Sequence, residues 1–170
     1  MKPYVMSAVL LLGAGCYKQP DRPIAEIQRV GGSVEVDEQA PDKPLVAVDV
    51  HGSEGADALV RRLESQTHLR RLDLGGTDVT DAGLAPLGAL TNLEELNLST
   101  TRIGDEGLQH LAGLTRLREL GLGGTRVSDA GLAHLRGLTR LERLNAVGTK
   151  VTADGVKDLQ KAVPQVEVQH

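Results

Sequence analysis

The chain of 170 residues lacks phenylalanine and tryptophan, and it has a single cysteine, Cys16. Its two tyrosines, Tyr4 and Tyr17, both lie near the N-terminus, so a folded core has to be built without aromatic side chains. One cysteine excludes a disulfide framework and every metal site that needs several thiolates. The formal net charge of -4 is mildly acidic and does not indicate the basic surface that nucleic-acid binding needs.

Leucine takes the place of the missing aromatic residues. The chain has 27 leucines, and 20 of them fall between Leu69 and Leu144. This concentration indicates a core of regular, repeated composition. The length suits one domain better than two.

The first sixteen residues have the layout of a secretory signal. Lys2 supplies a positive charge, Val5–Leu12 forms an apolar run too short to span a bilayer, and small residues lead to Cys16. The segment resembles a bacterial lipoprotein signal, although Gly13 stands where such signals usually have leucine. The resemblance implies removal of residues 1–15 and lipidation of Cys16. An ordinary signal peptide with an incidental cysteine, and a buried structural helix, are the alternatives.

Residues 16–23 contain two prolines and are expected to form an extended tether, because proline fits neither a helix interior nor a hydrogen-bonded ladder. Residues 24–44 are predicted to be an N-terminal cap made of a short helix, Ile24–Val30, and an alternating strand, Ser33–Asp37. Residues 165–170 begin a further strand, whose charged side chain discourages pairing with another chain. The two caps predict a complete domain.

Between these ends the sequence repeats itself every 24 residues. The copies begin at Leu45, Leu69, Leu93, Leu117 and Leu141. They share the pattern LxxLxLxxTxVxDxGLxxLxxLT, which is followed closely over Leu69–Arg140 and is degenerate in the first copy, and together they make five repeats over residues 45–164. A fixed period of this length is typical of solenoids, in which each unit packs on the one before.

The pattern resembles the leucine-rich-repeat family, nearest to its ribonuclease-inhibitor-like and cysteine-containing classes. The resemblance implies an α/β solenoid with parallel strands on the concave side and short helices on the convex side. It also implies a non-catalytic module that binds a protein or glycan partner. The chain departs from the family where threonine replaces the usual asparagine, at Thr77, Thr101, Thr125 and Thr149.

The spacing within one repeat predicts a place for each residue type. Leucines at the first, fourth and sixth positions alternate along a short strand. The threonine that follows can donate its hydroxyl to a loop carbonyl while its methyl group packs. Thr80 and Asp81 are N-cap candidates for a helix with leucines three residues apart. Gly83 is expected to let that helix approach its neighbour closely.

Outward-facing strand residues form the candidate interaction surface on the concave side. The predicted partner-binding residues are Arg70, Arg71, Asp73, Glu94, Glu95, Asn97, Arg118, Glu119, Glu142, Arg143 and Asn145. At the second position of the repeat the charge alternates in sign along the stack, so neighbouring side chains can pair across the sheet. Two interpretations stay open: a salt-bridge ladder that needs no partner, and a polar recognition surface whose interactions are sensitive to salt.

Other patterns are weaker candidates for chemistry. Four aspartates stack in register, namely Asp57, Asp81, Asp105 and Asp129. Such a column does not converge on one point as calcium requires, so the better interpretation is that these residues place negative charge at the start of each helix. His110 and His134 share a phase without a third ligand, and Arg126 stands where a dinucleotide fingerprint over Gly121–Gly124 needs glycine. We predict no cofactor, no metal and no enzymatic activity.

The sequence therefore predicts a monomeric interaction module of the cell envelope, facing the outer membrane or periplasm and held to the membrane by an N-terminal lipid. A protein or glycan is the expected partner, and nucleic acid is not. One alternative is a structural envelope lipoprotein without a dedicated ligand. Another is an intracellular substrate receptor or adaptor of the ubiquitin-ligase or effector type. That alternative ranks last, because residues 17–44 are too few and too polar to form a helical docking segment.

Overall fold

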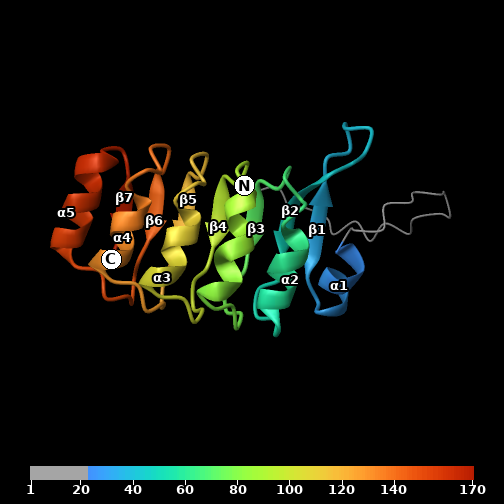
Figure 1. The fold of residues 1–170 in the computed structure, drawn as a ribbon, viewed down its shortest axis with the longest axis horizontal. Helices are drawn as coiled ribbons and strands as arrows, with labels where there is room; N and C mark the ends of the chain where they lie inside the picture. The colour runs from blue at the N-terminus through green and yellow to red at the C-terminus, as the bar shows by residue number, and fades with distance from the viewer. Residues whose placement is uncertain (1–22) are drawn as a thin grey trace, which may run out of the picture.

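A computed structural model describes residues 23–170; the predicted signal peptide, Cys16 and most of the tether lie outside the described residues. Within that part the chain forms one seven-stranded sheet whose strands follow each other in chain order, with short helices along one side (Figure 1). The strands are β1 (Ser33–Val36), β2 (Leu45–Asp49), β3 (Arg71–Asp73), β4 (Glu95–Asn97), β5 (Glu119–Gly121), β6 (Arg143–Asn145) and β7 (Glu167–Gln169). The first strand pairs antiparallel with the second, and every later pair is parallel.

The helices alternate with the strands. They are α1 (Ile24–Arg29), α2 (Ala56–Leu63), η1 (Ala82–Ala89), α3 (Asp105–Leu108), η2 (Gln109–Leu111), α4 (Asp129–Leu132), η3 (Ala133–Leu135) and α5 (Ala153–Ala162). Equivalent residues of successive repeats are paired in the sheet, as Leu72, Leu96 and Leu120 show. The predicted α/β solenoid is confirmed.

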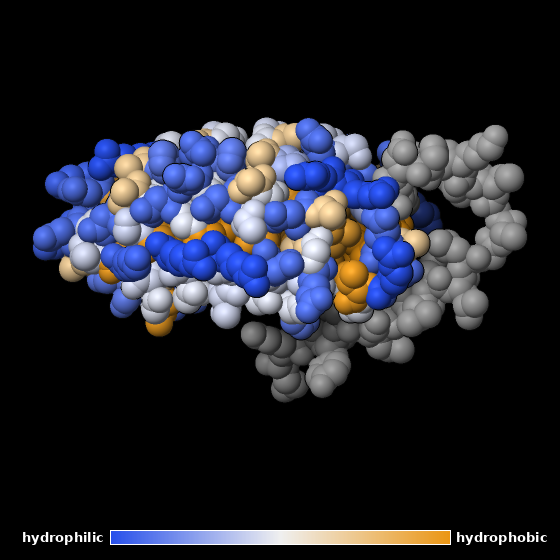
Figure 2. Space-filling view, turned by 60° about the horizontal axis from the view of Figure 1, so that its bottom comes forward, coloured by the Kyte–Doolittle hydropathy of each residue, from blue (hydrophilic) through white to orange (hydrophobic). Residues whose placement is uncertain are grey.

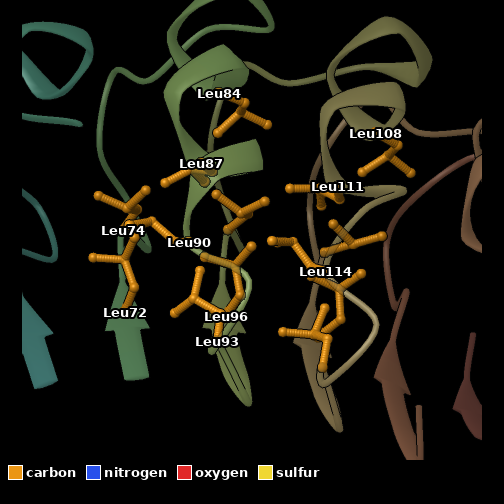
Figure 3. Packing of buried hydrophobic residues seen from close by; sticks show 14 of the residues in the cluster. Leu72, Leu74, Leu84, Leu87, Leu90, Leu93, Leu96, Leu108, Leu111 and Leu114 are labelled. Atoms are coloured by element: carbon orange, nitrogen blue, oxygen red, sulfur yellow. The ribbon is translucent and has the colours of Figure 1, made fainter. Parts of the chain in front are cut away.

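The core is a stack of leucines enclosed between the sheet and the helices. Leu72 and Leu96 from the strands meet Leu84 and Leu87 from η1, and all four are at most 3% exposed (Figure 3). The same arrangement recurs one repeat later around Leu111. Because no single repeat could enclose its leucines alone, each repeat depends on its neighbours for burial.

The helical segments of the middle repeats are tighter than an α-helix. The segment η1 is a 3₁₀-helix that contains Pro86, while α3 and α4 are single α-turns that continue as the 3₁₀ segments η2 and η3. Leucines three residues apart match the three residues per turn of a 3₁₀-helix and keep its buried side aligned. The spacing is thus compatible with the 3₁₀ geometry of these segments.

The repeated threonines behave as the sequence predicts. Each donates its hydroxyl to the carbonyl three residues earlier, at 2.6–2.7 Å. Thr77, Thr101 and Thr125 are buried, so these bonds satisfy hydroxyls that water cannot reach. The threonine closes the turn after each strand within its own repeat.

The stacked aspartates join neighbouring repeats. Asp57, Asp105 and Asp129 lie in the first turn of their helices, as expected, but their carboxylates bond to the next repeat and do not cap their own helices. Asp105 accepts hydrogen bonds from the backbone N–H and the hydroxyl of Ser128 in the next repeat, at 2.7 and 2.6 Å. Asp129 contacts Thr152 in the same way, at 2.8 and 2.7 Å. The capping role falls to the hydroxyl residue itself, since Ser128 accepts from the backbone N–H of Ala130 at the start of α4.

Glycine is required beside each of these carboxylates. A Cβ atom added at Gly131 would lie 2.5 Å from Oδ1 of Asp105, and one added at Gly107 would lie 2.5 Å from Oδ1 of Asp81. Real Cβ atoms do not approach oxygen so closely. The expected close approach is therefore confirmed, and its physical cause is the carboxylate of the preceding repeat.

One of these junctions is incomplete. Asp81 accepts from the backbone N–H of Gly104 at 2.7 Å, but Gly104 has no hydroxyl for the second carboxylate oxygen. The backbone of Gly104 is extended (φ -131°, ψ -159°), as at Ser128, and an added Cβ would lie 3.6 Å from Asp81 Oδ2.

We therefore expect Gly104→Ser to stabilise the protein. The new hydroxyl can donate to Asp81, and the control Gly104→Ala supplies the same backbone restriction without it. The serine variant should exceed the alanine variant by about 1 kcal/mol in the free energy of unfolding, measured by urea denaturation. Equal stability of the two variants would contradict the role assigned to the hydroxyl.

Candidate functional site

The side of the sheet turned away from the helices carries a shallow groove of about 670 Å³ that extends from β1 to β7. Side chains alternate along each strand, so the third and fifth residues of a repeat face the groove while the fourth, such as Leu96, is buried. We call this surface the strand groove. The part of the molecule turned to the viewer in Figure 2 is mostly hydrophilic, with hydrophobic residues in a narrow seam and a few patches.

The structure divides the predicted partner-binding residues into two groups. Those that line the strand groove are Arg71, Asp73, Glu95, Asn97, Glu119, Arg143 and Asn145. The remaining four, at the second position of the repeat, precede the strands and do not line the groove: Arg70, Glu94, Arg118 and Glu142. Two of these four, Arg70 and Glu94, line a separate hollow at the rim together with Val36 and Glu38.

The alternating charges form only part of the expected ladder. At the second position, Arg118 lies 3.6 Å from Glu142. At the third position, Arg143 pairs with Glu119, and Arg71 pairs with Glu35 of β1. All these side chains are 40–60% exposed, so each pair contributes little to stability.

Some charges of the surface are left without an ion pair. Among the described residues, none of the ion pairs includes Arg70, Glu94 or Glu95. Glu95 belongs to β4, the middle strand of seven, and lines the groove. The surface is therefore not a closed set of internal pairs.

Polar residues at the fifth position hold the ends of the strands. Asp73 accepts from the backbone N–H of Gly75 at 2.8 Å and from the side-chain amide of Asn97 at 3.0 Å. Asn97 accepts from the N–H of Ser99, and Asn145 from that of Val147, each at 3.0 Å. These side chains have a structural role as well as facing the groove.

The strand groove is acidic. Its lining includes two arginines and six carboxylates: Glu35, Asp49, Asp73, Glu95, Glu119 and Glu167. Sequence analysis did not assign Glu35 and Asp49 to the surface, because they lie in the N-terminal cap and in the degenerate first repeat. The signal was present for Asp49, which is in phase with Asp73 and pairs with it in the sheet.

His51 follows β2 and contacts the same carboxylate. Its Nδ1 lies 2.8 Å from Oδ1 of Asp49, and this hydrogen bond and the negative charge of Asp49 raise the pKa of His51 above its usual value. Protonation of His51 would therefore be favoured beside the groove as the pH falls toward its pKa.

Asp78 caps α2 from the following repeat, a contact that sequence analysis missed. Its carboxylate accepts from the N–H groups of Ala56 and Gly55 at 3.0 and 3.1 Å. These hydrogen bonds hold the pKa of Asp78 below its usual value, and nearby Arg102 contributes further. The two partners lie more than 20 residues apart in the sequence, so no local pattern predicts the contact.

The described part of the chain has no group of three or more histidine, cysteine, aspartate or glutamate side chains placed to hold a metal ion. The carboxylates of Asp57, Asp105 and Asp129 are each engaged by donors of the next repeat. Among residues 23–170, no helix is long and apolar enough to cross a membrane.

Comparison with known proteins agrees with this architecture. Residues 65–88 and 89–112 match the family model described as Leucine Rich repeat. No curated protein sequence matches the chain. The fold is a solenoid of short strand–helix units, and the family match identifies the repeat unit as a leucine-rich repeat. Residues 65–112 are thus leucine-rich repeats, and the described fold continues the same strand–helix unit on both sides of them.

Solved structures share the fold at low sequence identity. An internalin (inlF) from Listeria monocytogenes is 22% identical with a TM-score of 0.54, and the match covers 88% of this chain and 55% of that one. Internalin C2 (inlC2) from the same organism is 19% identical with a TM-score of 0.51, covering 89% and 83%. A chain of the BIR3–SERK2 complex from Arabidopsis thaliana is 20% identical with a TM-score of 0.52, covering 71% and 64%. The chain thus spans about half the length of inlF.

We expect Asp78→Asn to destabilise the protein at neutral pH by about 1 kcal/mol, because a neutral amide replaces a carboxylate that accepts two backbone N–H groups. The folded-state pKa is lowered, so the contribution is fully present above the unfolded-state pKa of about 4 and is lost as the pH falls through the folded-state pKa. The difference between variant and wild type should therefore shrink at about pH 3. Urea denaturation at both pH values measures it.

Glu54→Gln is the matched control for this experiment, because Glu54 is an exposed carboxylate next to Gly55, in the loop that Asp78 contacts. It should leave stability unchanged at both pH values. A loss in Asp78→Asn that stays constant down to pH 3 would contradict the capping role of the ionised carboxylate.

Proposed function

We propose that this protein is a non-catalytic interaction module of the cell envelope whose strand groove binds a protein partner. The observation that carries the proposal is the acidic lining of the groove, with the carboxylate of Glu95 free of ion pairs on the central strand. A partner surface that presents lysine or arginine side chains would complement this lining. No aromatic side chain lines the groove, so the interaction is expected to be ionic and sensitive to salt.

The fold supports a role in protein binding. Its shape presents a row of short, regularly spaced strands whose outward residues can vary without disturbing the leucine core. A chain of similar fold takes part in the BIR3–SERK2 complex of Arabidopsis. We therefore assign the strand groove of this protein to binding of a protein partner.

The cell-envelope location rests on the N-terminal sequence. The apolar run before Cys16 and the small residues next to that cysteine support export and lipidation of Cys16. The proline-containing segment after Cys16 would separate the solenoid from the membrane surface.

Reversing the unpaired charges tests the function of the groove and its rim. We expect Glu94→Lys with Glu95→Lys to weaken binding of a protein partner, recovered by cross-linking from the source cells, by about tenfold. The control Glu54→Lys with Glu106→Lys makes the same change in net charge at exposed positions outside the groove. Affinity is measured by titration at two salt concentrations. Unchanged binding by the Glu94/Glu95 variant would favour a structural envelope component without a ligand at this surface.

Mass spectrometry of the full-length protein, expressed beside Cys16→Ser, tests the anchor. We expect a chain that starts at residue 16 with a lipid-sized mass increment and partitions into detergent, and we expect both features to be lost in the variant. An unmodified full-length chain in the aqueous phase would contradict the envelope location and would favour the intracellular adaptor.

A further inference from the structure

Three basic side chains stand in register along the turns that follow β4, β5 and β6. They are Arg102, Arg126 and Lys150, which we call the basic row; each is exposed and lies 24 residues after the one before. Backbone hydrogen bonds fix their order, since the N–H of Arg126 donates to Ile103 at 3.0 Å and that of Lys150 to Val127 at 2.9 Å. The three side chains therefore lie on adjacent turns of the stack.

The negative charge of Asp78, at the equivalent position of the preceding repeat, acts on Arg102 at one end of the basic row, but it forms no ion pair with it. None of the ion pairs formed by residues 23–170 includes Arg102, Arg126 or Lys150. The stacked carboxylates of Asp105 and Asp129 are close in the fold, but both oxygens of each are occupied by donors of the next repeat. Like charges side by side at strand spacing repel each other, so the row is an unfavourable arrangement for the isolated protein.

A second unfavourable feature lies on the first of these turns. Thr100 has a φ of 58°, in the left-handed region, where the equivalent residues of other repeats are glycines such as Gly76 and Gly124. A β-branched residue in this conformation is strained, and such residues gather at functional sites. The hydroxyls of Thr100 and of the adjacent Ser99 make no hydrogen bond within the described structure, and Ser99 lines the strand groove.

We propose that the turn edge formed by the basic row and Thr100 binds an acidic segment of a protein partner. With strands about 4.8 Å apart, the three cations extend over roughly 10 Å. An extended peptide covers this distance with about three residues. Arginine guanidinium groups bind carboxylates through two parallel hydrogen bonds, and the threonine hydroxyl can donate a further one. This inference rests on the proposed function, because it names a second part of the same partner.

A protein segment fits the edge better than a larger polyanion does. The whole chain carries a net charge of -4, which repels an extended anionic surface such as nucleic acid or a membrane, whereas a short segment contacts only the basic row. The edge also has no aromatic residue on which bases could stack.

The test measures binding of a fluorescein-labelled glutamate octapeptide by fluorescence anisotropy at low salt. We expect saturable binding that is lost in about 0.5 M salt, because salt at that concentration screens interactions between exposed charges. Arg102→Gln with Arg126→Gln should weaken binding about tenfold, and Thr100→Gly should weaken it while raising the melting temperature. A glutamine octapeptide should not bind.

The control is Arg136→Gln with Arg140→Gln, which removes two exposed positive charges away from the turn edge. It should leave the affinity unchanged. Absence of binding by the wild type, or equal weakening in the control, would overturn the proposal. If partner binding is still lost in the Glu94/Glu95 variant, the proposed function stands without this edge.

Discussion

A carboxylate shared between consecutive repeats sets the spacing on which the rest of the structure depends. Each stacked aspartate reaches into the turn of the next repeat, and a glycine there leaves the space that the carboxylate occupies. The aspartate and the glycine are therefore useful only together, and only when the period stays constant. A single insertion would separate the pair and also shift the leucines of the core out of register.

This constraint explains why a core without phenylalanine or tryptophan is sufficient. When repeats are held at one spacing, the space between them can be filled by one type of side chain. Leucine at the strand and helix positions packs against its equivalents in the neighbouring repeats. A uniform core leaves the outward residues free to differ. The features that distinguish one repeat from another therefore lie in the exposed side chains, and these are almost entirely polar or charged.

The sequence predicts most of the fold because the period is local information. It indicates the strands, the buried leucines and the role of the threonines, which depend only on position within one repeat. It does not predict which repeat an aspartate contacts, and so it assigned Asp105 to its own helix instead of to Ser128. The cap on α2 by Asp78 was missed for the same reason. Placement of Arg70 and Glu94 at the rim required the start of each strand, which the structure puts one residue later, at Arg71 and Glu95.

Glu94 and Glu95 and the basic row, all without ion pairs, lie on different parts of this surface, while Arg70, which also has no ion pair, lies beside Glu94 at the rim. Unpaired carboxylates lie in and beside the strand groove, whereas unpaired cations of the basic row lie on the turns at its edge. In the central repeat only a few residues separate Glu95 in the groove from Arg102 on the edge, with Ser99 and Thr100 between them. One partner could therefore contact both surfaces across a single turn. Such a partner would be oriented as well as bound, because reversing it would place like charges against each other on both surfaces.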